Sequence, residues 1–173
     1  MVVHYPTVTQ ATKTNSAIDY ENPWMFQEQP FLSEDIGDSF GFVYRITNIQ
    51  TNKQYIGRKY FVQKRKPRGG GRRVTSESNW KTYYGSCPEL KEDIRRFGSD
   101  NFRRTILSLH RTGGRVNYSE TRQLFRCDVL TDSLTDGTPA YYNSNILGRY
   151  YRKDYYGTEP DQGLCDPENA PSR

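Results

Sequence analysis

Aliphatic and phenylalanine side chains are scarce in this chain: Leu, Ile, Val and Phe together make up 33 of its 173 residues. This fraction is close to the composition at which a chain cannot bury enough apolar surface to fold. Fourteen tyrosines and two tryptophans change the expectation, because large rings close a small core while their polar groups remain available to a partner. The sequence therefore predicts one small, aromatic-rich domain with extensions.

The sequence gives no sign of a membrane or export segment. No apolar run reaches the roughly 18 residues that a bilayer-spanning helix needs, and residues 1–10 lack a basic segment followed by an apolar one. We therefore expect a cytoplasmic protein. Cys87, Cys127 and Cys165 are odd in number and widely spaced, which fits neither a disulfide framework nor a Cys-x-x-Cys metal site. We expect reduced thiols.

Positive charge is concentrated in the middle of the chain. The net charge is +5, but residues 1–39 carry −5 and residues 157–173 carry −3, which leaves +13 on residues 40–156. A partner built of phosphates is the natural interpretation, because each Lys or Arg that meets a phosphate releases condensed counterions. A merely solvated basic surface is the alternative.

The densest part of this charge lies in a basic loop predicted over residues 58–79. Residues 58–73 hold eight cations and no acid, and Pro67 with Gly69–Gly71 predicts a mobile second half. The loop is not of the Walker type, which needs Lys and then Ser or Thr after the glycine, whereas Arg72 follows here. The residues predicted to bind nucleic acid are Arg58, Lys59, Lys64, Lys66, Arg68, Arg72 and Arg73.

Composition divides the chain into three parts. Residues 1–38 predict an acidic N-terminal arm without sustained periodicity, residues 39–156 a folded domain, and residues 157–173 an acidic disordered tail. The apolar cluster from Trp24 to Phe26 is expected to dock on the core, with docking on a partner as the alternative.

The domain is predicted to belong to the α+β class. Residues 40–48 are rich in β-branched and aromatic side chains and predict a strand, which forms an antiparallel hairpin with residues 55–57. Ser86 and Glu89 have the spacing of a capping box, so a helix is expected to start there and to end at Gly98.

The second half of the domain again predicts a strand followed by a helix. Residues 102–109 predict a strand, and a second helix is expected to open at Asn117, three residues before Glu120, and to run to about Leu130. Residues 141–146 predict a last short strand. The order β-β-α-β-α-β predicts a short central antiparallel sheet flanked by helices.

Motifs within residues 40–148 resemble those of the GIY-YIG nuclease family. Gly41-Phe42-Val43-Tyr44 corresponds to the first family motif with one extra residue, and Tyr55-Ile56-Gly57 matches the second. The segments Trp80–Ser86 and Asn101–Phe102 are similar to those of free-standing, Seg-type phage homing endonucleases. The resemblance implies a small GIY-YIG-like domain. Its candidate catalytic residues are Tyr44, Tyr55, Arg65, Tyr84, Glu120 and Asn143.

The resemblance also implies a role for each candidate. Glu120 is expected to hold one Mg²⁺ or Mn²⁺, the alternative being a helix cap only. Tyr44 is the expected general base, which requires nearby cations or metal to lower its pKa. Arg65 would stabilise negative charge in the transition state, with Arg58 as the alternative arginine.

The remaining candidates act beside these groups. Tyr55 and Tyr84 would hydrogen-bond the water or the phosphate, and Tyr83 competes with Tyr84 for this role. Asn143 would hold Glu120 or the local backbone in place, the alternative being a plain turn residue.

The predicted function is metal-dependent hydrolysis of double-stranded DNA by a phage homing-type endonuclease. A homodimer on DNA is one way in which a single small domain would cut both strands. Two other functions stay open: a non-catalytic nucleic-acid-binding module, and a structure-selective repair nuclease of the same fold.

Overall fold

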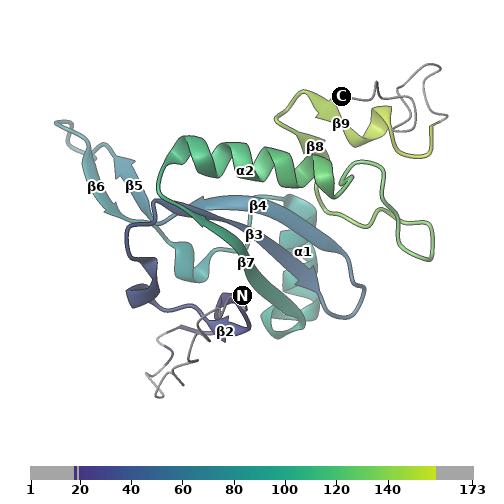
Figure 1. Ribbon diagram of the computed structural model, residues 1–173, viewed down its shortest axis with the longest axis horizontal. Coiled ribbons are helices and arrows are strands. Elements are labelled where there is room, and N and C mark those ends of the chain that lie inside the picture. Colours follow the sequence, from purple (N-terminus) through teal and green to yellow (C-terminus); the bar gives the residue numbers. More distant parts are fainter. Residues whose placement is uncertain (1–17, 19, 159–173) are drawn as a thin grey trace, which may run out of the picture.

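The computed structural model describes residue 18 and residues 20–158 (Figure 1). Most of the predicted N-terminal arm before Tyr20, and the predicted tail beyond its first two residues, lie outside the described residues, as does Cys165. Cys87 and Cys127 are free thiols, as expected.

The centre of the fold is a five-stranded sheet in the order β2-β1-β7-β3-β4. Its three long strands are antiparallel neighbours: β3 (Gly41–Asn48), β4 (Gln54–Tyr60) and β7 (Phe102–His110). The predicted hairpin and third strand are therefore present. The sheet is mixed rather than purely antiparallel, because β1 (Met25–Phe26) pairs parallel to β7, and β2 (Gln29–Pro30) then pairs with β1.

Two helices lie on opposite faces of this sheet, so the α+β prediction is confirmed (Figure 1). Helix α1 (Pro88–Phe97) ends at Gly98 as predicted, but Cys87 is its N-cap and no side chain caps it. Helix α2 spans Gly113–Arg126.

Helix α2 begins five residues earlier than predicted. The Thr112 side chain accepts a hydrogen bond from the Arg115 backbone N–H, so Thr112 rather than Asn117 is the N-cap. Glu120 consequently lies in the middle of the helix, which excludes the interpretation of Glu120 as a cap. The helix ends before the predicted Leu130, and Asp128 adopts a left-handed conformation.

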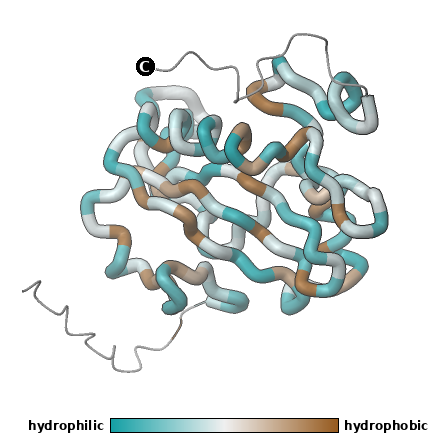
Figure 2. Tube along the Cα trace, turned by 45° about the vertical axis from the view of Figure 1, so that its right-hand side comes forward, coloured by the Kyte–Doolittle hydropathy of each residue, from teal (hydrophilic) through white to brown (hydrophobic). Residues whose placement is uncertain are grey.

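The side chains of β3 alternate between two hydrophobic clusters, one on each face. Figure 2 shows hydrophobic residues recurring along the strands of the central sheet. Phe42, Tyr44 and Ile46 face the cluster that includes Leu90 of α1. On the opposite face, Val43 packs in the cluster that includes Ile56 of β4 and Val116 and Leu124 of α2. The aromatic-rich core predicted from composition is thus present on the α1 face, whereas the cluster on the α2 face is mainly aliphatic.

The described part of the N-terminal segment belongs to the first cluster. Trp24 is fully buried there, and its ring lies 5.0 Å from that of Tyr44, so the predicted docking on the core is observed. Arg104 of β7 secures this segment: its buried guanidinium donates hydrogen bonds to the carbonyl oxygens of Glu21 and Asn22. The same guanidinium also bonds the carbonyl of Tyr83.

Two small sheets lie outside the central one. Strands β5 (Val62–Arg65) and β6 (Val74–Glu77) form a two-stranded ribbon within the predicted basic loop. Strands β8 (Asn145–Ile146) and β9 (Tyr150–Tyr151) pair with each other. The strand expected over residues 141–146 is therefore only partly formed, since Tyr141 makes a single bridge to Gln54 of β4.

Short helical turns complete the fold. Within the described residues the 3₁₀ turns are η1 (Ser33–Ile36), η2 (Trp80–Thr82), η3 (Ser99–Asn101) and η4 (Arg152–Asp154). In the part of the chain that the structure describes, neither helix is long and apolar enough to span a bilayer.

Candidate active site

The candidate site lies along the outer edge of the central sheet, where β4 is the last strand. Successive residues of a strand point to opposite faces, so Tyr55 and Gly57 share the face of Tyr44 while Ile56 and Arg58 face α2. Side chains from both faces meet at this edge in a groove of about 520 Å³. Its polar lining comes from Tyr55, Arg58, Ser86, Glu120, Asn143, Ser144 and Asn145.

An ion pair between Glu120 and Arg58 forms one wall of the groove. Glu120 projects from the buried side of α2 and is only 9% exposed, while the side chain of Arg58 is 40% exposed. Burial raises the pKa of Glu120, and the charge of Arg58 acts in the opposite direction. The pKa of Arg58 is raised: burial lowers it, but the carboxylate of Glu120 outweighs that effect.

Tyr44 lies behind the groove and does not line it. Its side chain is 1% exposed, and its ring packs against Trp24 and, at a centroid distance of 6.1 Å, against Tyr55. Burial, followed by the neighbouring tyrosines Tyr55 and Tyr83, raises the pKa of Tyr44 well above its ordinary value. A tyrosine that acts as a phenolate base needs a lowered pKa. In the protein without metal or substrate, the pKa of Tyr44 is not lowered.

The glycine of the second motif makes room for Tyr44. A Cβ atom on Gly57 would lie 2.6 Å from the hydroxyl oxygen of Tyr44 and 2.8 Å from its Cζ atom. Because real Cβ atoms do not approach other atoms so closely, a side chain at residue 57 would push the Tyr44 ring away from β4.

The structure brings Tyr83, not Tyr84, to the other tyrosines. The Tyr83 ring meets the Tyr44 ring edge-on, with 6.2 Å between the two ring centres. The ammonium of Lys59 lies 4.0 Å from the centre of the Tyr83 ring, as in a cation–π contact. Tyr84 instead stacks against the guanidinium of Arg104 at 4.4 Å.

Tyr55 is the tyrosine that reaches the groove. Its hydroxyl lies 3.3 Å from the Ser86 hydroxyl at the entry to α1. Burial raises the pKa of Tyr55, and the hydrogen bond to Ser86 acts against this rise. Tyr55 therefore presents a neutral hydroxyl to whatever binds in the groove.

Asn143 fixes the edge of β4. Its side-chain oxygen accepts the Ile56 N–H at 2.9 Å, and its amide donates to the Ile56 carbonyl at 2.8 Å. These two bonds replace those that a neighbouring strand would make. Of the two roles predicted for Asn143, the contacts match the one that holds the local backbone.

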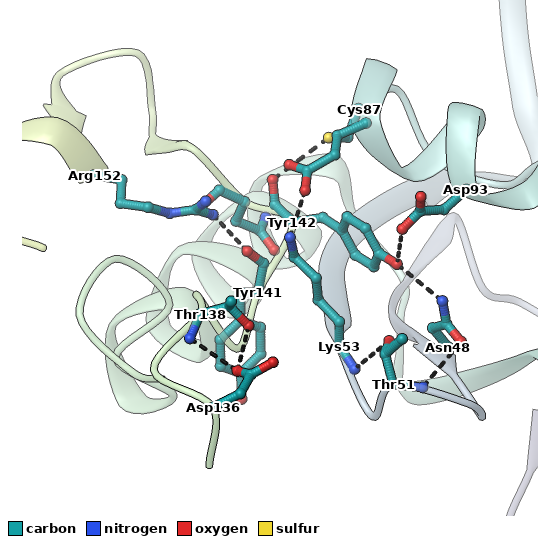
Figure 3. Close-up of polar contacts among 12 residues, drawn as sticks. Asn48, Thr51, Lys53, Cys87, Asp93, Asp136, Thr138, Tyr141, Tyr142 and Arg152 are labelled. Carbon is teal, nitrogen blue, oxygen red and sulfur yellow. Dashed lines mark hydrogen bonds and ion pairs between the residues drawn. The ribbon is translucent and has the colours of Figure 1, made fainter. Parts of the chain in front are cut away.

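The next residue back, Tyr142, ties this segment to the rest of the domain (Figure 3). Its hydroxyl donates to Asp93 of α1 at 2.7 Å and accepts from Asn48 at 3.2 Å. The guanidinium of Arg152 donates to the carbonyl of Tyr141. Residues 141–143 are thus held on both sides of the groove.

Arg65 lies on the ribbon and not in the groove. Its side chain is exposed at the end of β5, opposite Val74 of β6. The structure brings Arg58, the alternative arginine, to Glu120. Lys59 lies over the Tyr83 ring. The remaining predicted DNA-binding residues are exposed on the ribbon or its connecting turn: Lys64, Lys66, Arg68, Arg72 and Arg73.

The donor atoms in the groove are compatible with one divalent cation. Among the described residues, no group of three or more His, Cys, Asp or Glu side chains lies together. A hard cation would therefore take one carboxylate ligand from Glu120 and complete its shell with water and substrate oxygens, an arrangement typical of Mg²⁺. Glu120 suits this role because it is fixed on a helix and faces an open groove.

Sequence reasoning missed Ser86 and Arg104 as parts of the site or its support. Ser86 had been interpreted only as a helix cap, and Arg104 is indistinguishable in sequence from its exposed neighbour Arg103. Strand alternation along residues 55–58 is the signal that points to Arg58. It places Arg58 on the face opposite Tyr55, where a helix that carries a carboxylate can pack against it.

Fold and groove together define a small nuclease domain built on a tyrosine-rich edge strand. The model of the family described as "Putative endonuclease segE, GIY-YIG domain" matches residues 24–146. The chain therefore belongs to the Seg-type GIY-YIG nuclease family, whose domain is a phosphodiester hydrolase acting on DNA. No curated protein and no solved structure gives a significant match.

Proposed function

We propose that the protein is a metal-dependent DNA endonuclease whose catalytic centre is the groove at the edge of β4. The observation that carries the proposal is the meeting of Glu120, Arg58 and Tyr55 in one groove, although they come from α2 and from both faces of β4. Phosphodiester hydrolysis needs a metal ligand, a cation for the developing charge and a hydroxyl close to the phosphate. The groove supplies all three.

Glu120 is the proposed metal ligand, with Mg²⁺ or Mn²⁺ as the single ion. When bound, the ion polarises the scissile phosphate and stabilises the leaving oxygen. Arg58 already lies against Glu120, so its planar guanidinium is placed to bind a phosphate oxygen beside the carboxylate. Tyr55 donates a hydrogen bond from its hydroxyl to the phosphate or to the attacking water.

Tyr44 is the proposed proton acceptor. Burial keeps its pKa high, so the protein without substrate holds it as a phenol. We propose that Tyr44 releases this proton to solvent when substrate fills the groove, and that it then accepts a proton from the attacking water. The ammonium of Lys59, which lies over the neighbouring Tyr83 ring, favours the negative charge that Tyr44 carries in between.

The test is conversion of supercoiled plasmid to nicked and linear DNA with Mg²⁺, with Mn²⁺ and with EDTA, at about 100 mM salt. We expect metal-dependent cutting by the wild type, with the rate reduced at least 100-fold in Glu120→Ala and in Arg58→Ala. If the wild type shifts plasmid mobility but never cuts it, the protein is a nucleic-acid-binding module.

The finer assignment, a phage homing-type enzyme, is supported by the match to a Seg-type family. Mapping the cut positions on a long linear duplex tests it, because a homing enzyme cuts at few sites. A preference for branched or flapped DNA over linear duplex would indicate a repair nuclease instead. We further propose that two copies act on one duplex, which predicts nicked product first and linear product that rises more steeply with protein concentration.

A further inference from the structure

The ribbon formed by β5 and β6 has no role in the groove or the core. It projects away from the body of the domain (Figure 1). Every residue of its two strands except Gln63 is exposed, including Val62 and Val74, which is 57% exposed. A two-stranded ribbon with no packed face is marginally stable in water. Its exposed apolar and basic side chains therefore indicate a surface that a partner covers.

The charge of the ribbon identifies the chemistry of this partner. Residues 64–73 contain six cations and no acid. Four of them, Lys66, Arg68, Arg72 and Arg73, lie in the connection between the strands, where Gly70 and Gly71 have positive φ angles and form the turn. Such a density of cations matches a polyphosphate, and the ribbon begins directly after β4, the strand that carries the nuclease groove.

The dimensions of the ribbon fit the major groove of DNA. Two paired strands are about 4.8 Å apart, and the major groove is about 12 Å wide and admits a two-stranded β-ribbon. The register places Arg65 opposite Val74 and Gln63 opposite Ser76, so these four side chains share one face.

This face carries the side chains that read base edges. A guanidinium binds the two acceptors of guanine, and an aliphatic group packs against the thymine methyl. Gln63 donates to the Glu77 carbonyl at 3.1 Å, whereas no hydrogen bond or ion pair within the described residues engages the Arg65 guanidinium. Arg65 and Val74 thus form an unpartnered pair at the end of the exposed ribbon that adjoins the turn.

We propose that the ribbon lies in the DNA major groove, with Arg65 and Val74 against base edges and the cations of the turn on phosphates. Arg65 then determines sequence preference, while Arg58 acts at the cut. This inference rests on the proposed nuclease function for its location, because DNA held by the ribbon is delivered to the neighbouring groove.

The distance between the two arginines bounds where the preferred bases lie. Arg58 and Arg65 are seven residues apart, which spans at most about 23 Å at 3.3 Å per residue. At 3.4 Å per base pair this corresponds to about seven base pairs. The preferred bases are therefore expected within about seven base pairs of the cleaved bond.

The experiment is single-turnover cutting of a duplex library with a randomised segment, followed by sequencing of the cut ends. Arg65→Ala is compared with Arg73→Gln in the turn and with Lys91→Ala, which removes an exposed cation on α1 far from the ribbon. The slope of log affinity against log salt is measured for each variant on one fixed duplex.

We expect Arg65→Ala to lose a base preference of about 5- to 150-fold at one position, while its maximal cutting rate at saturating protein falls by less than about threefold. Arg73→Gln should keep the preference and reduce the salt slope by about 0.9. Lys91→Ala should resemble the wild type in both measurements.

Two results would overturn the inference: an unchanged preference in Arg65→Ala, or a maximal cutting rate as low as that of Arg58→Ala, which would make Arg65 catalytic. If the wild type cuts no DNA, the nuclease proposal fails by itself. The ribbon is then tested by selecting bound duplexes from the same library in EDTA, where loss of selection in Arg65→Ala supports the inference and equal selection refutes it.

Discussion

The bonds of Asn143 to β4 provide a direct measure of what holds the catalytic edge. Asn143→Ala leaves the N–H and the carbonyl of Ile56 without partners at a buried position. Each unsatisfied buried group costs about 1–3 kcal/mol, and because Asn143 borders the groove, water relieves part of this cost. We expect a loss of about 2–4 kcal/mol in the free energy of unfolding.

For a domain of this size, that loss lowers the melting temperature by about 8–16 °C. The assay is thermal unfolding followed by circular dichroism, with Asn145→Ala as the matched control. Asn145 also uses its side-chain oxygen, but only to accept the Gly148 N–H in a surface turn at 2.9 Å, so its variant should lose less than about 1 kcal/mol.

Activity supplies the second readout. Cutting measured well below the melting temperature should fall in Asn143→Ala, because Asn143 bonds the strand that carries Tyr55. A melting temperature of Asn143→Ala within about 2 °C of the wild type would refute the reasoning.

Three further predictions concern the site. Because the pKa of Glu120 is raised in the folded protein, the contribution of this group to stability is fully present below about pH 4.5 and is lost as pH rises through the native pKa. Glu120→Gln should therefore flatten the dependence of the unfolding free energy on pH in this range, measured by urea unfolding. The same variant should abolish cutting. Gly57→Ala forces a Cβ into Tyr44 and should cost about 1–3 kcal/mol, measured by the same unfolding assay. Tyr83→Leu should slow plasmid cutting more than Tyr84→Leu does, because Tyr83 contacts both the Tyr44 ring and the Lys59 ammonium whereas Tyr84 packs on Arg104, and the reverse order would contradict the proposed role of Tyr44.

Motif spacing predicted the site where the motif residues lie on regular elements. Tyr44 and Tyr55 come together because they occupy paired strands, and Glu120 reaches the same edge from a helix whose buried face is set by Val116 and Leu124. These relations follow from local periodicity, which a sequence displays directly.

Spacing along the chain could not decide between candidate residues that are close in sequence but whose side chains point to different parts of the fold. Arg58 and Arg65 are both basic and close to Tyr55 in sequence, and only the pairing of β4 and the exposed ribbon separates them. Tyr83 and Tyr84 are adjacent, so a rotation of the backbone decides which faces Tyr44. Long-range contacts of this kind carry no local pattern.

The ribbon and the start of α2 differed from expectation for local reasons. Pro67 and three glycines predicted an irregular loop, yet they occupy only the turn, and the residues on either side pair as strands. Thr112 caps α2 through its hydroxyl, but the two glycines that follow it are poor helix formers, so the sequence favoured the later Asn117 and Glu120 spacing.

The hydrogen bonds from Arg104 to the N-terminal segment form only after most of the domain has been synthesised. Its hydrogen bonds join the carbonyls of Glu21 and Asn22 to a residue made more than 80 positions later. Strand β1 likewise joins the three long strands of the sheet only through β7. At about 5–20 residues per second, β1 and the carbonyls of Glu21 and Asn22 wait roughly 4–16 s before β7 and Arg104 exist. For that time the N-terminal segment lacks the strand and the guanidinium that hold it on the domain, and a translational pause before residue 104 would lengthen the wait.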